Sequence, residues 1–324
     1  ESDIMDIILL RPTIKETLWG GRRLIDDFGM QTDGDNAAEA WLLSCHKDGP
    51  SYAVGGEYDG TALADIIEKE GREVLGTHNA DINGFPVLIK IIDACDRLSV
   101  QVHPGDEYAR RVENENGKTE AWFVLSADDG AELIYGVNKN MTREQFAASI
   151  ENGTLLENVN RVKVKPGDVV FIPSGMLHAI GAGILLAEVQ QSSNTTYRVF
   201  DYDRRDKNGN KRELHVKKAT DVVTLTKTDA DFAPEGEEKQ LCGATKRLLT
   251  HCRYFSMTEL KADGDFEDVA DETSFVSLLV LDGSGEIFAN GKTYALKKGS
   301  SVFIPASFGK YTLRGSFRAL ETRT

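Results

Sequence analysis

The sequence predicts a mainly β protein made of two jelly-roll-like barrels, with a few short helices. The 324-residue sequence contains many short apolar runs separated by turns rich in glycine, proline and aspartate, which is typical of barrel proteins. One stretch, Lys165–Pro173 (KPGDVVFIP), returns 132 residues later as Lys297–Pro305 (KKGSSVFIP). Because a repeated turn-and-strand unit indicates a repeated fold, the two copies predict two related barrels.

The predicted domains are residues 1–230, with small helical insertions, and residues 231–324. The repeat offset places Lys310 opposite His178, so the second copy keeps the scaffold but lacks the histidine. The alternative is that Phe-Ile-Pro is a chance tripeptide within a strand, although the preceding Lys-x-Gly turn matches as well. The acidic, polar and proline-containing stretch Thr226–Gln240 is the predicted linker.

The first third of the chain predicts strands at Ile7–Arg11, Ala38–Cys45 and Val87–Ile92, and short helices at Arg22–Phe28 and Thr61–Lys69. In the second of these helices, Leu63, Ile66 and Ile67 form an i, i+3, i+4 apolar face. Thr61 is its expected N-cap, and Gly71 is expected to end it.

The middle of the chain predicts strands at Leu98–His103, Ala121–Leu125, Ala131–Val137 and Ile184–Val189, and another apolar strand that ends at Pro173. Thr142 and Gln145 form a capping-box pattern, which predicts a helix that runs to about Ile150. Asp201–Lys211 is a charged loop with Asn-Gly-Asn at its tip.

The stretch Leu98–Leu125 holds the densest set of potential metal ligands. If Leu98–His103 is a strand, Gln101 and His103 share one face with Ser99, and the apolar residues between them point the other way. Glu120 opens the next apolar run, and a Pro-Ser-Gly turn after the repeat presents His178.

Two imidazoles, one carboxylate and one amide oxygen make a nitrogen and oxygen site without thiolate, which favours zinc or another divalent first-row ion. The alternative is that each histidine is a core residue bonded to the backbone. Gln101 and His103 lie two residues apart in one strand, and a turn presents a second histidine, His178. This arrangement favours a metal site over two core histidines. The predicted ligands are Gln101, His103, Glu120 and His178.

The net charge of −14 argues against a nucleic-acid partner, because phosphate neutralisation needs clustered cations. An anionic substrate would therefore need a local basic pocket. No run approaches the ~18 apolar residues of a membrane helix, and no signal-peptide pattern is present. The four cysteines are scattered without a Cys-x-x-Cys motif, so we expect reduced thiols in a cytoplasmic protein. The oligomeric state is left open.

Several motifs carry a resemblance to a known family. Gly167–His178 fits the second cupin motif, except that Ala182 replaces the asparagine that often follows. The first cupin motif has Gln101 in place of its first histidine. Together with three further motifs, this Gln-x-His variant resembles the short bacterial form of the type I mannose-6-phosphate isomerases. The three further motifs are Leu18–Gly21, Gly117–Glu120 and Gln191–Asp203.

The resemblance implies two cupin domains, the second without metal, and one zinc ion held by the four predicted ligands. It implies interconversion of mannose 6-phosphate and fructose 6-phosphate, with a phosphorylated hexose as substrate. Generic cupin spacing would make Glu107 the carboxylate ligand, but the family and the apolar strand that follows favour Glu120. Asn194 departs from the aspartate expected in many relatives, which leaves the role of that position open.

Three residues are candidates for the chemistry. Arg198 resembles the active-site arginine of the family, and its planar fork suits an enediolate or phosphate oxygen. Lys118 lies two residues before Glu120 and could meet the phosphate or a hydroxyl. Glu188 lies inside an apolar strand, where burial would raise its pKa and suit it to proton transfer.

Each candidate also has a structural alternative. Arg198 could form a salt bridge with Asp201 or Asp203. Lys118 could be a solvated loop lysine, and Glu188 could pair with a nearby arginine.

Two other functions compete with isomerisation. A metal-dependent cupin dioxygenase would need an open position for oxygen, and it gives no reason for basic residues near the metal. A non-catalytic bicupin that binds sugar phosphates would be expected to lose a metal ligand, whereas all four are present here.

Overall fold

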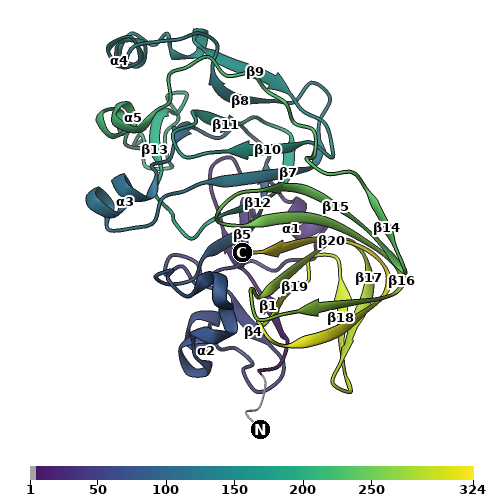
Figure 1. Cartoon of the computed structure of the whole chain (residues 1–324). Coiled ribbons are helices and arrows are strands. Elements are labelled where there is room, and N and C mark those ends of the chain that lie inside the picture. Colours follow the sequence, from purple (N-terminus) through teal and green to yellow (C-terminus); the bar gives the residue numbers. More distant parts are fainter. Residues whose placement is uncertain (1–4) are drawn as a thin grey trace.

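The computed structural model describes residues 5–324 as a mainly β molecule, as predicted. In this part of the chain the strands form sheets of nine, six and five strands. None of these sheets closes into a complete barrel within residues 5–324, so the predicted barrels are open. Figure 1 shows the nine-stranded sheet at the lower right and the other two above it.

Antiparallel neighbours make up the two smaller sheets. The six-stranded sheet has the order β10 (Val169–Ile172), β7 (Glu120–Ala127), β12 (Ile184–Gln191), β5 (Val87–Ala94), β3 (Glu39–Leu43) and β2 (Thr13–Lys15). The five-stranded sheet has the order β13 (Tyr197–Phe200), β6 (Val100–Val102), β11 (His178–Ile180), β8 (Glu132–Val137) and β9 (Val159–Lys163).

The six-stranded sheet is covered on both faces. Every residue of β5 and β12 is buried. From β5, Ile89 and Ile91 belong to a core cluster that includes Phe303 of the C-terminal region, defined here as residues 239–324. Ile92 points the other way, into a cluster with Ile180 of the five-stranded sheet. Because side chains alternate along a strand, Lys90 shares this second face.

The nine-stranded sheet joins the two ends of the chain. Leu9 of β1 is paired with Val302 of β19, so an N-terminal strand lies within the C-terminal sheet. The division at residue 230 therefore stays a prediction. The strand order is β14 (Lys239–Leu241), β15 (Ala244–His251), β16 (Ser256–Ala270), β20 (Gly309–Arg323), β17 (Val276–Ala289), β19 (Ser301–Ile304), β1 (Ile8–Arg11) and β4 (Tyr52–Val54), with β18 (Lys292–Lys297) paired to β17.

The two sequence repeats form the same structural unit. Strands β10 and β19 each end before a proline, and a turn then leads to the next strand, β11 or β20. Lys310, at the position that corresponds to His178, is exposed and pairs with Glu267 at 2.7 Å. The stretch predicted as a linker connects the sheets. Its Phe232 side chain is buried, and the Phe232 carbonyl accepts the Val169 N–H at 2.8 Å.

Five α-helices occupy connections within residues 5–324: α1 (Arg23–Asp26), α2 (Leu63–Glu70), α3 (Asp106–Glu113), α4 (Arg143–Glu151) and α5 (Val216–Val222). Three short 3-10 helices accompany them: η1 (Arg72–Leu75), η2 (Thr77–Asn79) and η3 (Leu155–Glu157). The capping box of α4 is confirmed. Gly71 ends α2 with φ 100, but the N-cap is Ala62, so the prediction of Thr61 was wrong.

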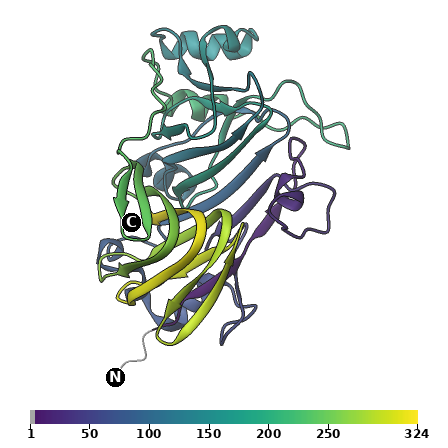
Figure 2. The same ribbon diagram turned by 90° about the vertical axis from the view of Figure 1, so that its right-hand side faces the viewer.

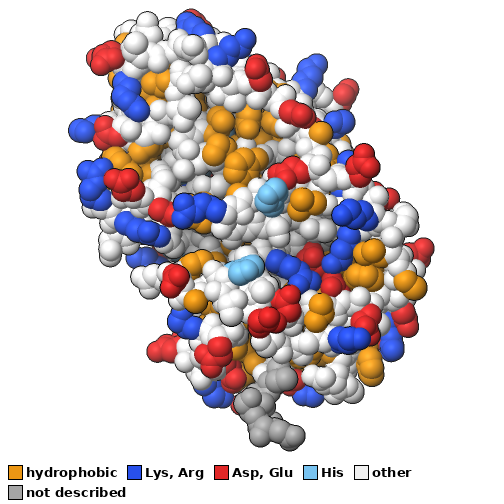
Figure 3. All heavy atoms as spheres, in the orientation of Figure 1, with side chains coloured by type: hydrophobic (Ala, Val, Ile, Leu, Met, Phe, Trp, Pro, Cys, Tyr) orange, Lys and Arg blue, Asp and Glu red, His pale blue; other side chains and the backbone are white. Residues whose placement is uncertain are grey.

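Helices α4 and α5 pack on the outer face of the five-stranded sheet. Phe146 of α4 and Ala219 of α5 share a core cluster with Val100 and Val102 of β6. Figure 1 shows these helices with α3 along one side of the molecule, and Figure 2 shows the C-terminal strands curving in front of the smaller sheets. Across the face in Figure 3, positive side chains are interspersed with negative ones. The helices of residues 5–324 are all too short or too polar to cross a membrane.

Candidate active site

Three buried side chains form a compact cluster between the two smaller sheets. His103, Glu120 and His178 place one potential ligand atom each within 4.8 Å of one another. His178 Nε2 lies 3.2 Å from Glu120 Oε1, and His103 Nε2 lies 3.5 Å from Glu120 Oε2. Strand register brings His178 close to the strand that leads to His103, because His178 at the start of β11 is paired with Gln101 of β6. Gln101 and Glu120 line one cavity. With the Gln101–His178 pairing and the contacts of Glu120, all four predicted ligands lie in one region.

Backbone carbonyls orient both imidazoles. His103 Nδ1 lies 2.9 Å from the Thr195 carbonyl, and His178 Nδ1 lies 2.8 Å from the Met176 carbonyl. A carbonyl oxygen can only accept, so each Nδ1 carries the proton and each Nε2 is left with its lone pair towards Glu120.

The donor set fits a divalent cation. His178 Nε2 and Glu120 Oε2 are buried without a hydrogen-bond partner, which is costly unless another group meets them. Burial, and next the Lys118 charge, lower the pKa of His103 to about 3. Burial raises the pKa of Glu120, but Lys118 and His103 outweigh it and hold the pKa well below its usual value. Neutral imidazoles and an ionised carboxylate are the forms that bind metal.

Lys118 contacts two members of this three-residue cluster. Its Nζ lies 3.3 Å from both Glu120 Oε2 and His103 Nε2, and the side chain is buried. Lys118 is therefore not a solvated loop lysine.

Arg198 reaches the same cavity from β13. It is paired with Gln101, while its neighbours Tyr197 and Val199 point to the opposite face and are buried there. Its Nε donates to Ser99 Oγ at 3.3 Å, and its Nη1 donates to the Glu213 carbonyl at 3.1 Å. Burial, followed by the nearby Arg212, lowers the pKa of Arg198.

The proposed salt bridge of Arg198 does not form. Asp201 is instead bound by Arg204 and Arg212, and Asp203 is bound by Lys211. Among residues 5–324, Arg198 has no carboxylate within ion-pair distance. Its charge is therefore available to a bound anion.

A polar cavity of about 170 Å³ lies between Lys118, Glu120 and Arg198. Its walls come from both smaller sheets and from the loops at their ends. The residues that line it are Thr17, Trp19, Glu39, Lys90, Ile92, Leu98, Ser99, Gln101, Lys118, Glu120, Trp122, Ile180, Glu188, Asn194, Thr196, Arg198 and Arg212.

Comparison with known proteins identifies the family. Residues 7–126 match the family described as "Phosphomannose isomerase type I, catalytic domain", and residues 244–323 match "Mannose-6-phosphate isomerase, cupin domain". The chain is 40% identical over 310 residues to the probable mannose-6-phosphate isomerase GmuF of Bacillus subtilis, covering 95% of this chain and 96% of that protein. This chain belongs to the type I mannose-6-phosphate isomerase family.

Further relatives support the same assignment. Mannose-6-phosphate isomerase ManA of Bacillus subtilis is 39% identical over 309 residues, covering 95% of this chain and 96% of that protein. The crystal structure of the mannose 6-phosphate isomerase from Bacillus subtilis matches with a TM-score of 0.91 at 36% identity, covering 98% of this chain and 99% of that one. A phosphomannose isomerase from Salmonella typhimurium matches at 0.77 with 16% identity, over 98% of this chain and 99% of that one, and shares the fold.

In this member of the mannose-6-phosphate isomerase family, Glu120 and Glu107, the two candidates for the carboxylate ligand, lie in different environments. Glu120 opens β7 beside the histidines, whereas Glu107 is exposed on α3. Asn194, the departure from the expected aspartate, lies at the cavity mouth and donates its side-chain N–H to Asp48 Oδ2 at 3.0 Å.

Sequence reasoning missed a buried ion-pair chain in the wall of this isomerase-family site. Lys90 Nζ lies 3.4 Å from Glu39 Oε2 and 3.5 Å from Glu188 Oε1, and it stands 4.6 Å over the Trp41 ring. Glu188 is thus paired with a lysine and not with an arginine, and it accepts the Trp122 indole N–H at 2.8 Å. The one sequence feature that could have indicated this ion-pair chain is the single lysine inside the apolar run Val87–Ile92.

The charges in this chain shift one another's pKa values. Burial lowers the pKa of Lys90, but Glu39 and Glu188 outweigh burial, so the pKa is raised overall. Burial, and then the Glu120 charge, raise the pKa of Glu188. Glu188 is therefore a weaker acid than an exposed glutamate and can hold a proton more readily.

Replacing Lys90 with methionine is expected to lower the free energy of unfolding by about 3 kcal/mol, because the buried Glu188 and the partly buried Glu39 lose their cation. Urea denaturation followed by tryptophan fluorescence measures the change. Lys217→Met is the matched control, since it removes an exposed pair with Asp221 and should cost less than about 1 kcal/mol. A Lys90→Met protein as stable as the unmodified one would contradict the expectation.

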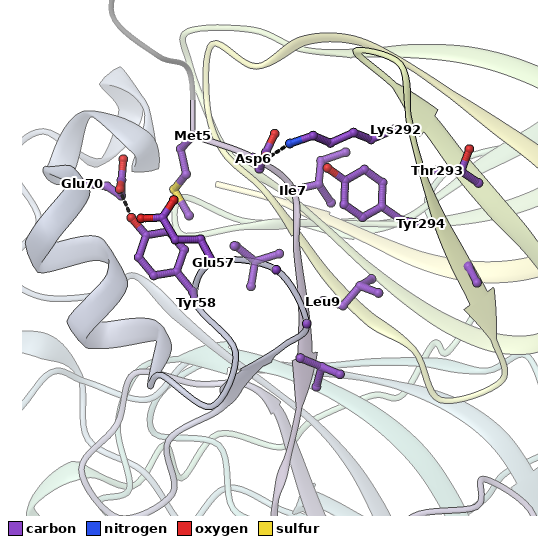
Figure 4. A pocket seen from close by; sticks show the side chains of 15 residues that line it. Met5, Asp6, Ile7, Leu9, Glu57, Tyr58, Glu70, Lys292, Thr293 and Tyr294 are labelled. Carbon is purple, nitrogen blue, oxygen red and sulfur yellow. Dashed lines mark hydrogen bonds and ion pairs between the residues drawn. The ribbon is translucent and has the colours of Figure 1, made fainter.

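A larger cavity, of about 710 Å³, lies at the other end of the molecule, between β1, β18 and the loop that follows β4. Figure 4 shows two pairs in its wall, Asp6 with Lys292 and Glu70 with the Tyr58 hydroxyl. The described residues that line it include no histidine. Its chemistry therefore does not resemble that of the His103–Glu120–His178 cluster.

Proposed function

We propose that this protein interconverts mannose 6-phosphate and fructose 6-phosphate by moving a proton between C2 and C1 through an enediol. The observation that carries the proposal is the buried set of His103, Glu120 and His178 in a chain from this family. Lys118 lies beside this set, and Arg198 lines the same cavity as Lys118 and Glu120. The substrate is a phosphorylated hexose, and the cations in the wall supply the local basic pocket that an acidic protein needs for an anion.

One divalent metal ion, proposed to be zinc, would be held by Gln101, His103, Glu120 and His178. When bound, such an ion polarises substrate oxygens and offsets negative charge that develops on them. The side chains that remain must bind the sugar phosphate, orient it and move its proton.

Lys118 and Arg198 are proposed to bind the negative charges of the substrate. The guanidinium of Arg198 is fixed by Ser99 and by a carbonyl, so its remaining N–H groups can meet an enediolate or phosphate oxygen without reorganisation. The Lys118 ammonium is a point charge that can approach a phosphate or hydroxyl oxygen.

Glu188 is proposed to transfer the proton. Its Oε1 is buried without a hydrogen-bond partner, and its Oε2 is fixed by the Trp122 indole. A raised pKa brings a carboxyl group closer to neutral pH, where proton transfer in both directions is efficient.

The cavity wall distinguishes this function from the two alternatives. An oxygen-activating cupin gains nothing from Lys118 and Arg198, whereas a phosphosugar needs such cations. A binding protein without turnover has no use for a carboxyl group of raised pKa beside the ligand. The proposal includes a cytoplasmic location, which rests on four unpaired cysteines.

Conversion of mannose 6-phosphate to fructose 6-phosphate, measured before chelation, after it and after addition of zinc, tests the proposal. We expect turnover to fall by at least about 100-fold on chelation and to return with zinc. About one metal ion bound per chain with no turnover would contradict the isomerase function while leaving the metal site in place.

A further inference from the structure

One side chain of the C-terminal region contacts Asp106, which is itself hydrogen-bonded to the segment that carries Lys118 and Glu120. Tyr254 lies in the turn between β15 and β16, and its hydroxyl donates to Asp106 Oδ2 at 2.8 Å. The other side-chain hydrogen bonds from the C-terminal region to residues 5–230 go elsewhere, to Asp6, Leu42, His78 and Asn79.

Asp106 links Tyr254 to the Gly117–Glu120 segment. Its other oxygen, Oδ1, accepts the Gly117 N–H at 2.9 Å and the Gln191 side-chain N–H at 3.0 Å. Three donors therefore hold one carboxylate. Burial raises the pKa of Asp106, but the Gly117 N–H and the Tyr254 and Gln191 side chains outweigh burial and lower it.

Gln191 continues the network to Thr119, which lies between Lys118 and Glu120. Its Oε1 accepts the Thr119 N–H at 2.9 Å, and its backbone N–H donates to the Thr119 carbonyl at 3.0 Å. The Lys118 N–H donates to the Pro104 carbonyl at 3.0 Å. This backbone is thus held by Pro104 and by Gln191, and both Gln191 and Gly117 are hydrogen-bonded to Asp106.

The close fit at Gly117 shows how little room the segment has. A Cβ atom there would lie 2.5 Å from the Asp106 nitrogen and 2.7 Å from the Gly105 carbonyl carbon. A shift of Asp106 would therefore displace the backbone that leads to Lys118 and Glu120.

We propose that Tyr254 is a positioning residue for the isomerase site, by which the C-terminal region holds Asp106 and through it the Gly117–Glu120 segment. The catalytic part of this inference rests on the proposed function. Through Asp106, the C-terminal region would then help to align Lys118 and Glu120, although it supplies none of the proposed metal ligands.

Tyr254→Phe, studied in the zinc-loaded protein, tests the proposal by two independent measurements. Amide hydrogen exchange of the Gly117–Glu120 segment should become about tenfold faster, because Asp106 loses a charge-assisted hydrogen bond. The kcat for mannose 6-phosphate should fall about five- to tenfold, with KM changed by less than about twofold. In an Asp106→Asn background, the same substitution should have little further effect on either quantity.

Tyr58→Phe is the matched control, because it removes a tyrosine–carboxylate hydrogen bond at the distant cavity and should leave both measurements unchanged. Unchanged exchange in Tyr254→Phe would overturn the proposal, and so would faster exchange with undiminished kcat. If the unmodified protein does not turn over mannose 6-phosphate, the proposed function fails. Hydrogen exchange alone then decides whether Tyr254 holds the segment.

Discussion

Replacing Glu120 with glutamine is expected to lower kcat/KM for mannose 6-phosphate by about 10³-fold or more. Zinc binding should weaken by at least about 100-fold. Glu120 is the one carboxylate of the buried three-residue cluster, and its lowered pKa keeps it ionised at neutral pH. The amide removes the anionic ligand and leaves the buried Lys118 ammonium without a counter-charge, so two stabilising interactions are lost together.

Glu107→Gln is the matched control for this substitution. Glu107 occupies the carboxylate position that generic cupin spacing would select, but it is exposed on α3, so its variant should keep full zinc binding and activity. Isothermal titration with zinc and steady-state kinetics give both quantities. A Glu120→Gln protein that binds zinc as tightly as the unmodified chain would exclude Glu120 as a ligand.

The difference between these two glutamates shows what sequence could decide. Glu120 opens an apolar run, so its place at the start of a buried strand could be predicted. The helix that carries Glu107 could not, because only Ala109 of α3 is buried and the helix has no apolar stripe to detect. Helix α5 was missed for the same reason, since Ala219 is its one buried residue.

The ion-pair chain in the site wall depends on strand register. Glu188 is paired with Lys90 on one neighbouring strand and with Trp122 on the other, so the three side chains share a face. Trp41 is paired with Lys90 from the third strand, β3. A single sequence shows that Lys90 is unusual within an apolar strand, but not which strands lie beside it.

Long-range pairing also explains why β1 was not assigned to the C-terminal sheet. Its pattern predicts a strand, and the strand is there. Its partner β19 lies about 290 residues later, and nothing local specifies that choice. The Tyr254–Asp106 contact is likewise invisible in the sequence, because it joins a turn to the first residue of α3, 148 residues away.

The second large effect is expected at Arg198. Arg198→Ala should lower kcat/KM for mannose 6-phosphate by about 10²- to 10³-fold while zinc content stays unchanged. The guanidinium is held over the cavity by Ser99 and Glu213, and no carboxylate among residues 5–324 neutralises it. Its charge is therefore available to oxygens of the substrate. Steady-state kinetics and metal analysis of the purified variant measure the two quantities.

The division between kcat and KM shows which oxygens Arg198 meets. If the guanidinium binds the developing enediolate, most of the decrease in kcat/KM should come from a lower kcat. If it binds the phosphate, most of the decrease should come from a higher KM. Arg161→Ala is the control, because Arg161 pairs with Glu132 on the surface, outside the lining of this cavity. Full activity in Arg198→Ala would show that the charge has another role, and the anion-binding function would then rest on Lys118 alone.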